Sequence, residues 1–295
     1  MGVTIVTVAN KSYYPFLDIF LNSAKRHLPE LHKVYVGDAG LGSFRGEVAA
    51  KDWVELVDLS LQDNFLGVHS SGWKTATSFK TQLLASVLAK SAGNSPVFLI
   101  DSDVCILKNI LELVDPAFDL QVTTMADGGH TRSDGKFIKE IASFMIFNNP
   151  QKCLHFVDEW RGRLMNFEND KVQAPHETPA LNEVLREFEA ISSKLNNTGL
   201  RIGYLNEDLV CADLKEFPGT YAVHFKSVGP SKRSAYKNFL SRVTAVKPVN
   251  LNRPQTDYFT YLSKTGYSKW LRWAITAGFF QRLRVFWGSI LYRSF

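Results

Sequence analysis

Residues 97–107 read VFLIDSDVCIL, an apolar run that is interrupted by two carboxylates one residue apart. In an extended segment residues i and i+2 point to the same side, so we expect Asp101 and Asp103 to face one ligand at the end of a strand. Two like charges are costly to bury unless a positive charge compensates them. A divalent cation that carries a diphosphate would do so, because hard cations bind carboxylate and phosphate oxygens together. The motif alone also fits a strand end with two solvated aspartates.

Composition limits the class of protein. The chain has 295 residues, of which 45% are hydrophobic, so it can bury the core of one large domain or of a domain with an appendage. Its three cysteines are widely spaced and odd in number, which favours neither a disulfide framework nor a zinc site. The N-terminus runs directly into a strand pattern without the features of a signal peptide, and no apolar run of about 18 residues follows. We expect reduced thiols and a catalytic body on the cytoplasmic side of a membrane.

The net charge of +5 is concentrated near the C-terminus. No acidic residue follows Asp257, whereas residues 264–295 contain six lysines and arginines, so the rest of the chain carries a net charge of −1. This distribution argues against a nucleic-acid-binding protein and indicates a local anionic partner.

Strand and helix patterns alternate along the chain. The expected strands are 3–8, 33–37, 53–59, 96–100, 120–125, 141–148, 201–204 and 220–225, and the expected helices are 13–27, 73–90, 150–167 and 179–191. Such alternation predicts an α/β fold with a mostly parallel sheet, in which ligands bind outside the carboxyl ends of the strands. Asn10, Asp38 and Asp101 follow three of these strands, so we expect them to line one crevice.

Three later segments add polar groups in a fixed order. Residues 142–148 read ASFMIFN, residues 176–182 read HETPALN, and residues 224–232 read HFKSVGPSK. With the acidic pair, this series resembles the GT-A-fold glycosyltransferases, especially the retaining family that includes bacterial lipooligosaccharide galactosyltransferases and glycogenin. The resemblance extends roughly over residues 3–232. It implies a GT-A fold, which is Rossmann-like with a mostly parallel central sheet flanked by helices.

The resemblance also implies a set of site residues. Asp101, Asp103 and His224 would hold Mn²⁺ or Mg²⁺, and Glu177 or Thr178 would lie beside the anomeric carbon as the catalytic position. The implied contacts with the nucleotide-sugar donor are Ala9, Asn10, Asp38, Lys80, Ser102, Gly229 and Lys232.

The sequence departs from the family pattern at three points. Phe144 stands where a glycine is usual, Glu177-Thr178 replaces an Asp-Gln pair, and two extra residues separate His224 from Gly229. Some site residues also have a plain structural interpretation. Glu177 is an acid that the N-terminus of a helix favours, and Lys80 is compatible with an ordinary surface lysine.

The C-terminal tail has its own pattern. Residues 247–255 are typical of a linker, and residues 279–291 place aromatic and aliphatic side chains on one helical face with arginines elsewhere. A basic, tryptophan-containing amphipathic helix of this kind resembles one that lies on an anionic membrane surface. The alternative is a C-terminal helix that packs on the body. We therefore expect a catalytic domain over 1–246 and a linker with a basic amphipathic helical tail over 247–295, which binds membrane through residues 264–295.

These observations predict a metal-dependent glycosyltransferase that moves a hexose from a nucleotide-sugar, expected to be a UDP-hexose, to a membrane-presented glycan or glycolipid with retention. One alternative is an inverting transferase, for which Glu177, Asp170 or Glu207 would serve as the base. A sugar-phosphate nucleotidylyltransferase is disfavoured because no glycine-rich, arginine-containing loop follows the first strand. The remaining alternative is a catalytically inert membrane-binding module with the same fold.

Overall fold

The computed structural model describes residues 2–11, 13–59, 71–91, 95–125, 128–131, 137–169, 177–194, 199–210 and 219–225. The chain divides into two compact units, Met1–Ser227 and Val228–Phe295, and every described residue belongs to the first. The predicted boundary between residues 246 and 247 and the predicted amphipathic tail both lie outside the described residues.

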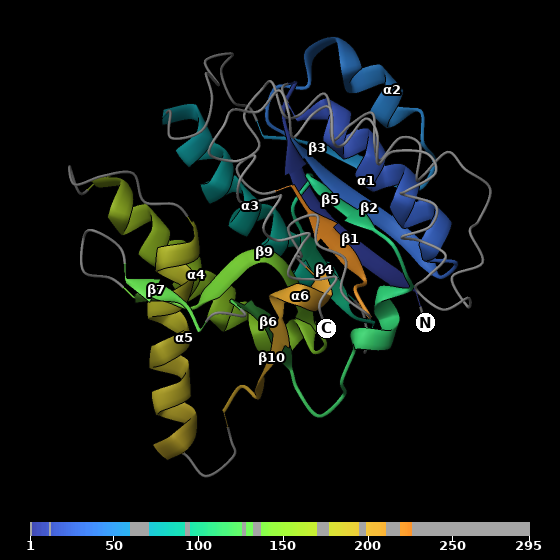
Figure 1. The fold of residues 1–295 in the computed structure, drawn as a ribbon. Coiled ribbons are helices and arrows are strands. Elements are labelled where there is room, and N and C mark those ends of the chain that lie inside the picture. The colour runs from blue at the N-terminus through green and yellow to red at the C-terminus, as the bar shows by residue number, and fades with distance from the viewer. Residues whose placement is uncertain are drawn as a thin grey trace, which may run out of the picture. The chain divides into compact units, whose positions relative to one another are not determined.

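A seven-stranded sheet forms the centre of the described part of the chain (Figure 1). In order across the sheet, its strands are β10 (Ile202–Asn206), β6 (Leu120–Thr124), β9 (Glu140–Phe147), β4 (Val97–Ile100), β1 (Val3–Ala9), β2 (Leu31–Asp38) and β3 (Val54–Asp58). Neighbouring strands are parallel except that β9 runs antiparallel to both β4 and β6. The predicted mostly parallel α/β sheet is therefore confirmed.

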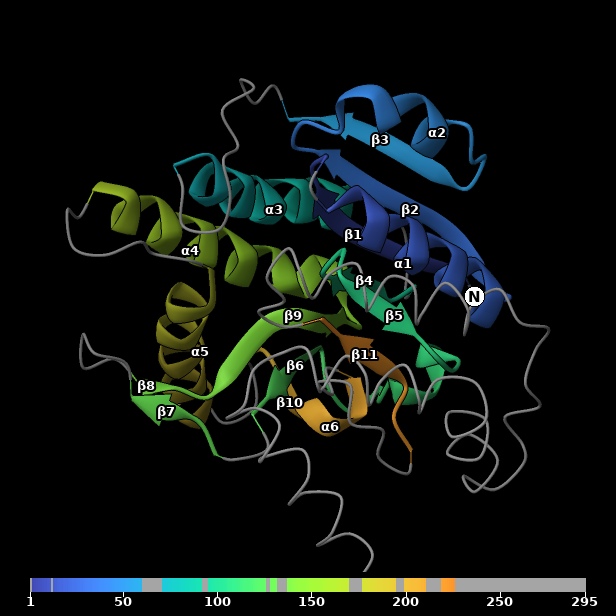
Figure 2. The ribbon, with the colours of Figure 1, turned by 45° about the horizontal axis from the view of Figure 1, so that its top comes forward.

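Helices cover both faces of this sheet. They are α1 (Tyr14–His27), α2 (Arg45–Ala49), α3 (Ser71–Lys90), α4 (Pro150–Asn169), α5 (Glu177–Lys194) and α6 (Glu207–Val210). Side chains of β4 alternate between two cores, because Phe98 and Ile100 pack in the core that contains α1, whereas Leu99 packs in the core that contains α3, α4 and α5. Figure 2 shows α3 and α4 side by side, and they are in contact.

Short elements complete the described structure. Two 3₁₀ turns, η1 (Gly42–Phe44) and η2 (Ile110–Leu113), connect longer elements. Two short strands that the sequence did not predict, β7 (His130–Thr131) and β8 (Phe137–Ile138), pair antiparallel with each other. A further strand that the sequence did not predict separately, β5 (Val104–Ile106), pairs antiparallel with β11 (Ala222–His224).

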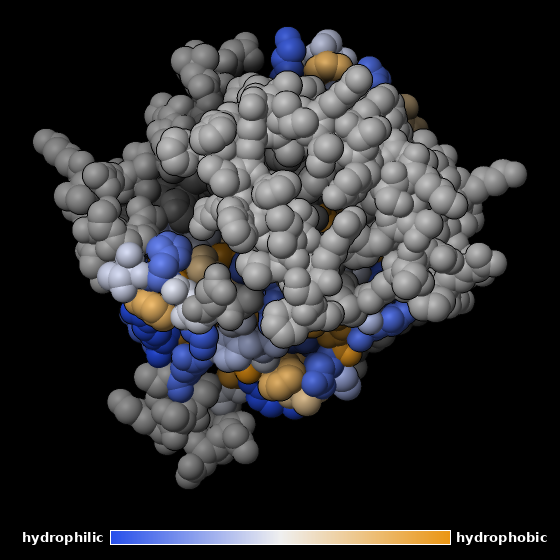
Figure 3. Space-filling model, viewed as in Figure 1, coloured by the Kyte–Doolittle hydropathy of each residue, from blue (hydrophilic) through white to orange (hydrophobic). Residues whose placement is uncertain are grey.

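The described surface is mixed in polarity. Figure 3 shows hydrophobic and hydrophilic side chains interspersed where described residues are visible on this face. Within the described segments no helix combines the length and the apolar character that crossing a membrane requires.

Candidate metal centre

The predicted acidic pair lies at the point where the strand order of the sheet changes direction. The strand β1 is flanked by β4 on one side and by β2 on the other, and all three run parallel. In open α/β sheets ligands bind at such a point, outside the carboxyl ends of the strands. Asp101 directly follows β4, so the backbone places it there.

A turn, rather than an extended strand, brings the two carboxylates together. The segment from Asp101 to Asp103 connects β4 with β5, and the backbone N–H of Val104 donates a hydrogen bond to the Asp101 carbonyl over 3.2 Å. The Asp101 N–H donates to the Ser143 carbonyl (2.9 Å), which holds the turn against β9. The two carboxylates do lie together, as expected, but not because they share one side of an extended segment. The chain reverses locally and buries Ser102 within the turn.

The short antiparallel pairing of β5 with β11 places His224 beside the acidic pair. In its register His224 lies opposite Val104, next to Asp103 in the chain. The N–H of Phe225 donates to the Asp103 carbonyl (2.9 Å). On the other side of β5, the Ile106 N–H donates to the hydroxyl of the buried Ser23 on α1 (3.0 Å), which fixes the ladder to the body. A residue more than 100 positions later is thereby held beside the acidic pair.

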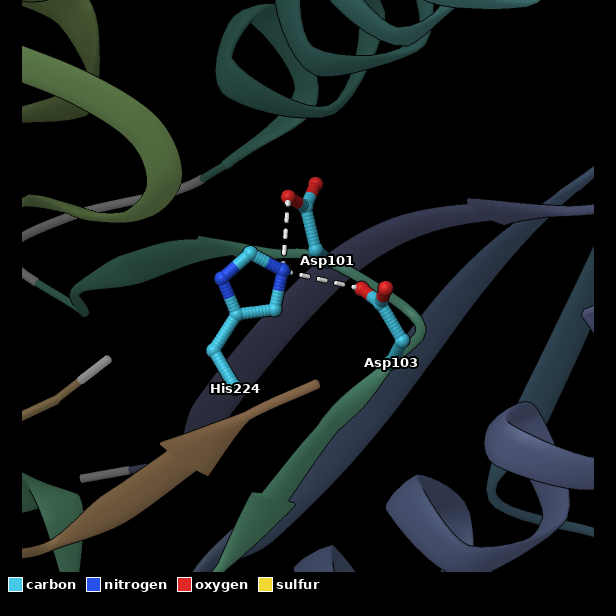
Figure 4. Close-up of side chains that lie close together, drawn as sticks. All are labelled: Asp101, Asp103 and His224. Carbon is cyan, nitrogen blue, oxygen red and sulfur yellow. Dashed lines mark hydrogen bonds and ion pairs between the residues drawn. The ribbon is translucent and has the colours of Figure 1, made fainter. Parts of the chain in front are cut away.

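Figure 4 shows the His224 imidazole with one nitrogen directed at both carboxylates. His224 Nε2 lies 3.2 Å from Asp103 Oδ1 and 3.8 Å from Asp101 Oδ2. One ligand atom from each of the three residues falls within 4.8 Å of the others. Ligands about 2.1 Å from an octahedral ion lie about 3.0 Å apart when adjacent and about 4.2 Å apart when opposite. The donor set and its spacing therefore fit a divalent metal ion.

Lys80, on α3, supplies a buried positive charge beside this group. Its Nζ lies 2.5 Å from Asp101 Oδ1 and 3.0 Å from Glu177 Oε1, and it donates to the Ala142 carbonyl over 3.1 Å. Burial by itself would lower the pKa of Lys80, but the Asp101 and Glu177 carboxylates outweigh burial and raise the pKa above its usual value. The interpretation of Lys80 as an ordinary surface lysine is therefore wrong, since its side chain is 5% exposed.

Glu177 is the first residue of α5, where the helix dipole favours an acid. Trp160 Nε1 donates to its carbonyl (2.9 Å), while its Oε2 is buried without a hydrogen-bond donor among the described residues. Burial raises the pKa of this carboxyl, and the neighbouring Lys80 ammonium opposes the increase. Glu177 and Asp101 thus share a single described ammonium, and the described cluster has more carboxylates than cations.

Asn182 is a residue whose role the sequence did not show. Its Oδ1 accepts from the N–H groups of Lys139 (2.9 Å) and Glu140 (3.1 Å), and its Nδ2 donates to the carbonyls of Glu140 and Thr178 (2.8 Å each). All four hydrogen bonds of the amide are made, and they join the first turn of α5 to the start of β9. An asparagine within the HETPALN segment carries no sequence signal for this role.

The other predicted residues fall into two groups. Asn10 lies at the end of β1, and its Oδ1 accepts a hydrogen bond from the N–H of Tyr13 (3.1 Å). Asp38 lies at the end of β2, and its Oδ1 accepts from the N–H of Leu41 (2.7 Å). Asp38 also pairs with Arg45. The buried Ala9 accepts from Ala39 N–H through its carbonyl (2.9 Å), so nucleotide contacts for these three positions remain predictions.

Some of the remaining predicted positions lie outside the described residues. Thr178 is the second residue of α5, whereas Gly229 and Lys232 lie outside the described residues. Phe144, where the family pattern has a glycine, is fully buried and packs edge-on against Phe98, so its side chain belongs to the core.

One family of known proteins matches more than half of the chain. The family model described as Nucleotide-diphospho-sugar transferase matches residues 49–234. No curated protein sequence matches the chain.

Solved structures share the fold at low sequence identity. A galactosyltransferase, LgtC, in complex with donor and acceptor sugar analogues is 14% identical, with a TM-score of 0.54 over 86% of this chain and 98% of that one. The bifunctional glycosyltransferase WbbM is 13% identical, with a TM-score of 0.52 over 85% of this chain and 51% of that one. GlyE from Streptococcus pneumoniae TIGR4 is 11% identical, with a TM-score of 0.50 over 84% and 61% of the two chains. The GT-A fold is therefore confirmed.

Proposed function

Because the chain belongs to the nucleotide-diphospho-sugar transferase family and is a glycosyltransferase that uses a nucleotide-sugar, we propose that it moves a hexose from a UDP-sugar in a metal-dependent, retaining reaction. The observation that carries this proposal is the convergence of Asp101, Asp103 and His224 at the carboxyl end of β4. Two carboxylates and an imidazole form a mixed oxygen and nitrogen donor set that suits Mn²⁺, or Mg²⁺ with fewer nitrogen contacts.

These three side chains would hold the ion together with the two phosphates of the donor. When bound, the metal supplies Lewis-acid stabilisation of the negative charge that develops on the departing nucleoside diphosphate. The protein contributes a rigid frame, since the turn hydrogen-bonds to β9 and the β5–β11 ladder is fixed to α1. Such preorganisation lowers the cost of placing charged groups at the reacting centre.

Lys80 balances charge on the other side of Asp101. Its ammonium occupies Asp101 Oδ1, which leaves Oδ2, the oxygen nearer to His224, for a cation. Its raised pKa keeps it protonated at neutral pH, so the charge is present throughout the working range. The three N–H donors of Lys80 already have acceptors in Asp101, Glu177 and the Ala142 carbonyl, so we propose that Lys80 acts on the donor phosphates through its positive charge.

Glu177 and Thr178 are proposed to meet the transferred sugar. The buried Oε2 of Glu177 needs a donor, and a hydroxyl of the hexose would provide one. In a retaining reaction of this kind the leaving diphosphate takes the proton of the acceptor hydroxyl, so no separate base is required. Gly229 and Lys232 are proposed to hold the diphosphate through a backbone amide and an ammonium.

The acceptor is proposed to be a glycan or glycolipid at the cytoplasmic face of a membrane. The support is the sequence of residues 264–295, where six basic residues and no acidic ones accompany an aromatic helical pattern. Each basic residue near an anionic leaflet contributes about 1 kcal/mol of binding free energy. Sedimentation with anionic vesicles, for the full chain and for a chain ending at residue 263, tests this part separately from catalysis.

The experiment for the donor reaction is release of nucleoside diphosphate from a panel of nucleotide-sugars without acceptor, in Mn²⁺ or in EDTA. We expect Mn²⁺-dependent release from one UDP-hexose, lost in Asp103→Asn. The matched control is Asp158→Asn, which removes an exposed carboxylate on α4 and should leave release unchanged. Absence of both release and metal-dependent nucleotide binding would leave the inert membrane-binding module as the better account.

A further inference from the structure

Two large hydrophobic side chains are exposed on the described surface. Phe137 is 40% and Tyr204 is 42% exposed, and among the described residues they are the large hydrophobics that reach this exposure. Lys139 follows Phe137 by two residues, and its Nζ lies 5.6 Å from the centroid of the Tyr204 ring. We call Phe137, Lys139 and Tyr204 the aromatic strip.

The backbone holds the strip in place. Exposure alternates along residues 137–140, so Phe137 and Lys139 share the outward side of this segment while Ile138 and Glu140 are buried. Gly129 has a φ of 92°, and a side chain there would collide with the Ile138 carbonyl and press on the Phe137 ring. Arg186, on α5, donates to the Phe137 carbonyl over 2.7 Å. Figure 3 shows hydrophobic and hydrophilic side chains together over this hairpin.

The strip is connected to the metal centre through β9 and α5. Asn182 binds the N–H of Lys139 and also the carbonyl of Thr178, next to Glu177. From Lys139 the chain continues three residues to Ala142, whose carbonyl accepts from Lys80. Three residues of strand span about 10 Å, so Lys139 lies about that distance along the chain from Ala142. We infer that the strip meets sugar units next to the reacting one rather than the reacting sugar itself.

Resting on the proposed function, we propose that the aromatic strip is a subsite for the acceptor glycan, which binds sugar units beyond the one that receives the hexose. The apolar C–H face of a sugar ring packs on an aromatic face, and tyrosine adds a hydroxyl for hydrogen bonding. The cationic Lys139 and Arg186 supply donors for sugar hydroxyls. The strip also lies on the β6–β9–β10 half of the sheet, opposite the β1–β2–β3 half where the nucleotide is expected.

The test compares the full-length wild type with Tyr204→Ala, Phe137→Ala and the ring-preserving control Tyr204→Phe. The acceptors are immobilised oligosaccharides of increasing length, from single hexoses upward, and the donor is the one identified by release without acceptor. We expect the wild type to prefer the longer acceptors. Both alanine variants should raise KM for them about tenfold, with kcat retained, because one stacked ring contributes on that scale. Tyr204→Phe keeps the stacking ring and loses only the hydroxyl, so it should raise KM less than either alanine variant.

Release of UDP without acceptor separates this inference from the proposed function and also checks folding, since neither Phe137 nor Tyr204 is among the residues proposed to hold the donor. Unchanged release with unchanged KM for long acceptors in the alanine variants would overturn the inference alone. If the wild type releases UDP but transfers to no glycan, labelled protein with UDP and Mn²⁺ is applied to the same surface. Retention of the protein on the surface that does not increase with glycan length would then overturn the inference. Self-association of the wild type that the alanine variants abolish would overturn it as well. No release from any donor would remove the proposed function instead, and the inference with it.

Discussion

Replacement of Lys80 by methionine tests the charge balance of the site. The change keeps the apolar stem and removes an ammonium that is 5% exposed and contacts Asp101 and Glu177, which are 26% and 12% exposed. Loss of one partner of a buried ion pair costs about 3–5 kcal/mol. We expect a decrease of about 3 kcal/mol in the free energy of unfolding, because Asp101 keeps some contact with water. That is a large share of a typical total of about 5–15 kcal/mol.

The assay is urea denaturation at pH 7 in EDTA, so that no divalent ion replaces the missing charge. Lys90→Met removes an exposed lysine at the end of the same helix and serves as the control, with an expected change within about 0.5 kcal/mol. The double variant K80M/E177Q should regain part of the loss, because it removes the more buried of the two carboxylates that K80M leaves without a cation. A stability of K80M equal to that of the control, or no recovery in the double variant, would refute the reasoning.

Further predictions concern groups away from the metal centre. Hydrogen bonds from Arg201 hold the pKa of Asp119 below its usual value, although burial acts in the opposite direction. The contribution of ionised Asp119 to stability is therefore present above about pH 4 and is lost as the pH falls through the lowered pKa. Asp119→Asn should therefore be about 2 kcal/mol less stable at pH 7, and the difference should shrink towards pH 2 in acid-dependent unfolding; a pH-independent gap would contradict this. Burial raises the pKa of the Cys153 thiol to about 12 and Cys105 is also buried, so mass spectrometry should find both unalkylated by iodoacetamide at pH 8 until urea is added. The hydroxyl of Thr7 is buried without a described hydrogen-bond partner, so Thr7→Val should gain about 1 kcal/mol in thermal or urea unfolding, and a loss would show that the hydroxyl is satisfied.

The sequence predicted most strands of the main sheet and its mostly parallel character, because these strands are short apolar runs between clear helical patterns. It did not predict that β9 runs antiparallel to its neighbours. Every residue of this strand is buried, so the sequence shows no alternation of polar and apolar side chains. The pattern of a fully buried strand does not show whether the strand runs parallel or antiparallel to its neighbours. Its direction depends on how the chain connects the strands in space.

For the candidate metal centre, the sequence predicted which residues take part but not how they come together. The carboxylates of Asp101 and Asp103 and the later His224 were found by motif order, and the structure brings them together. Their means of convergence, a turn and a three-residue ladder, depends on pairing between segments about 120 residues apart, which local pattern does not encode. Asn182 was missed for a similar reason, since its four hydrogen bonds join α5 to β9 and exist only after packing.

The most direct test of the account is a Mn²⁺ titration followed by electron paramagnetic resonance, with and without UDP, on the wild type, Asp103→Asn, His224→Ala and the control Asp158→Asn. We predict one Mn²⁺ site per chain that UDP strengthens, weakened at least about tenfold in the Asp103 and His224 variants and unchanged in the control. Equal Mn²⁺ affinity in all four proteins would contradict the assignment of Asp101, Asp103 and His224 as the metal centre.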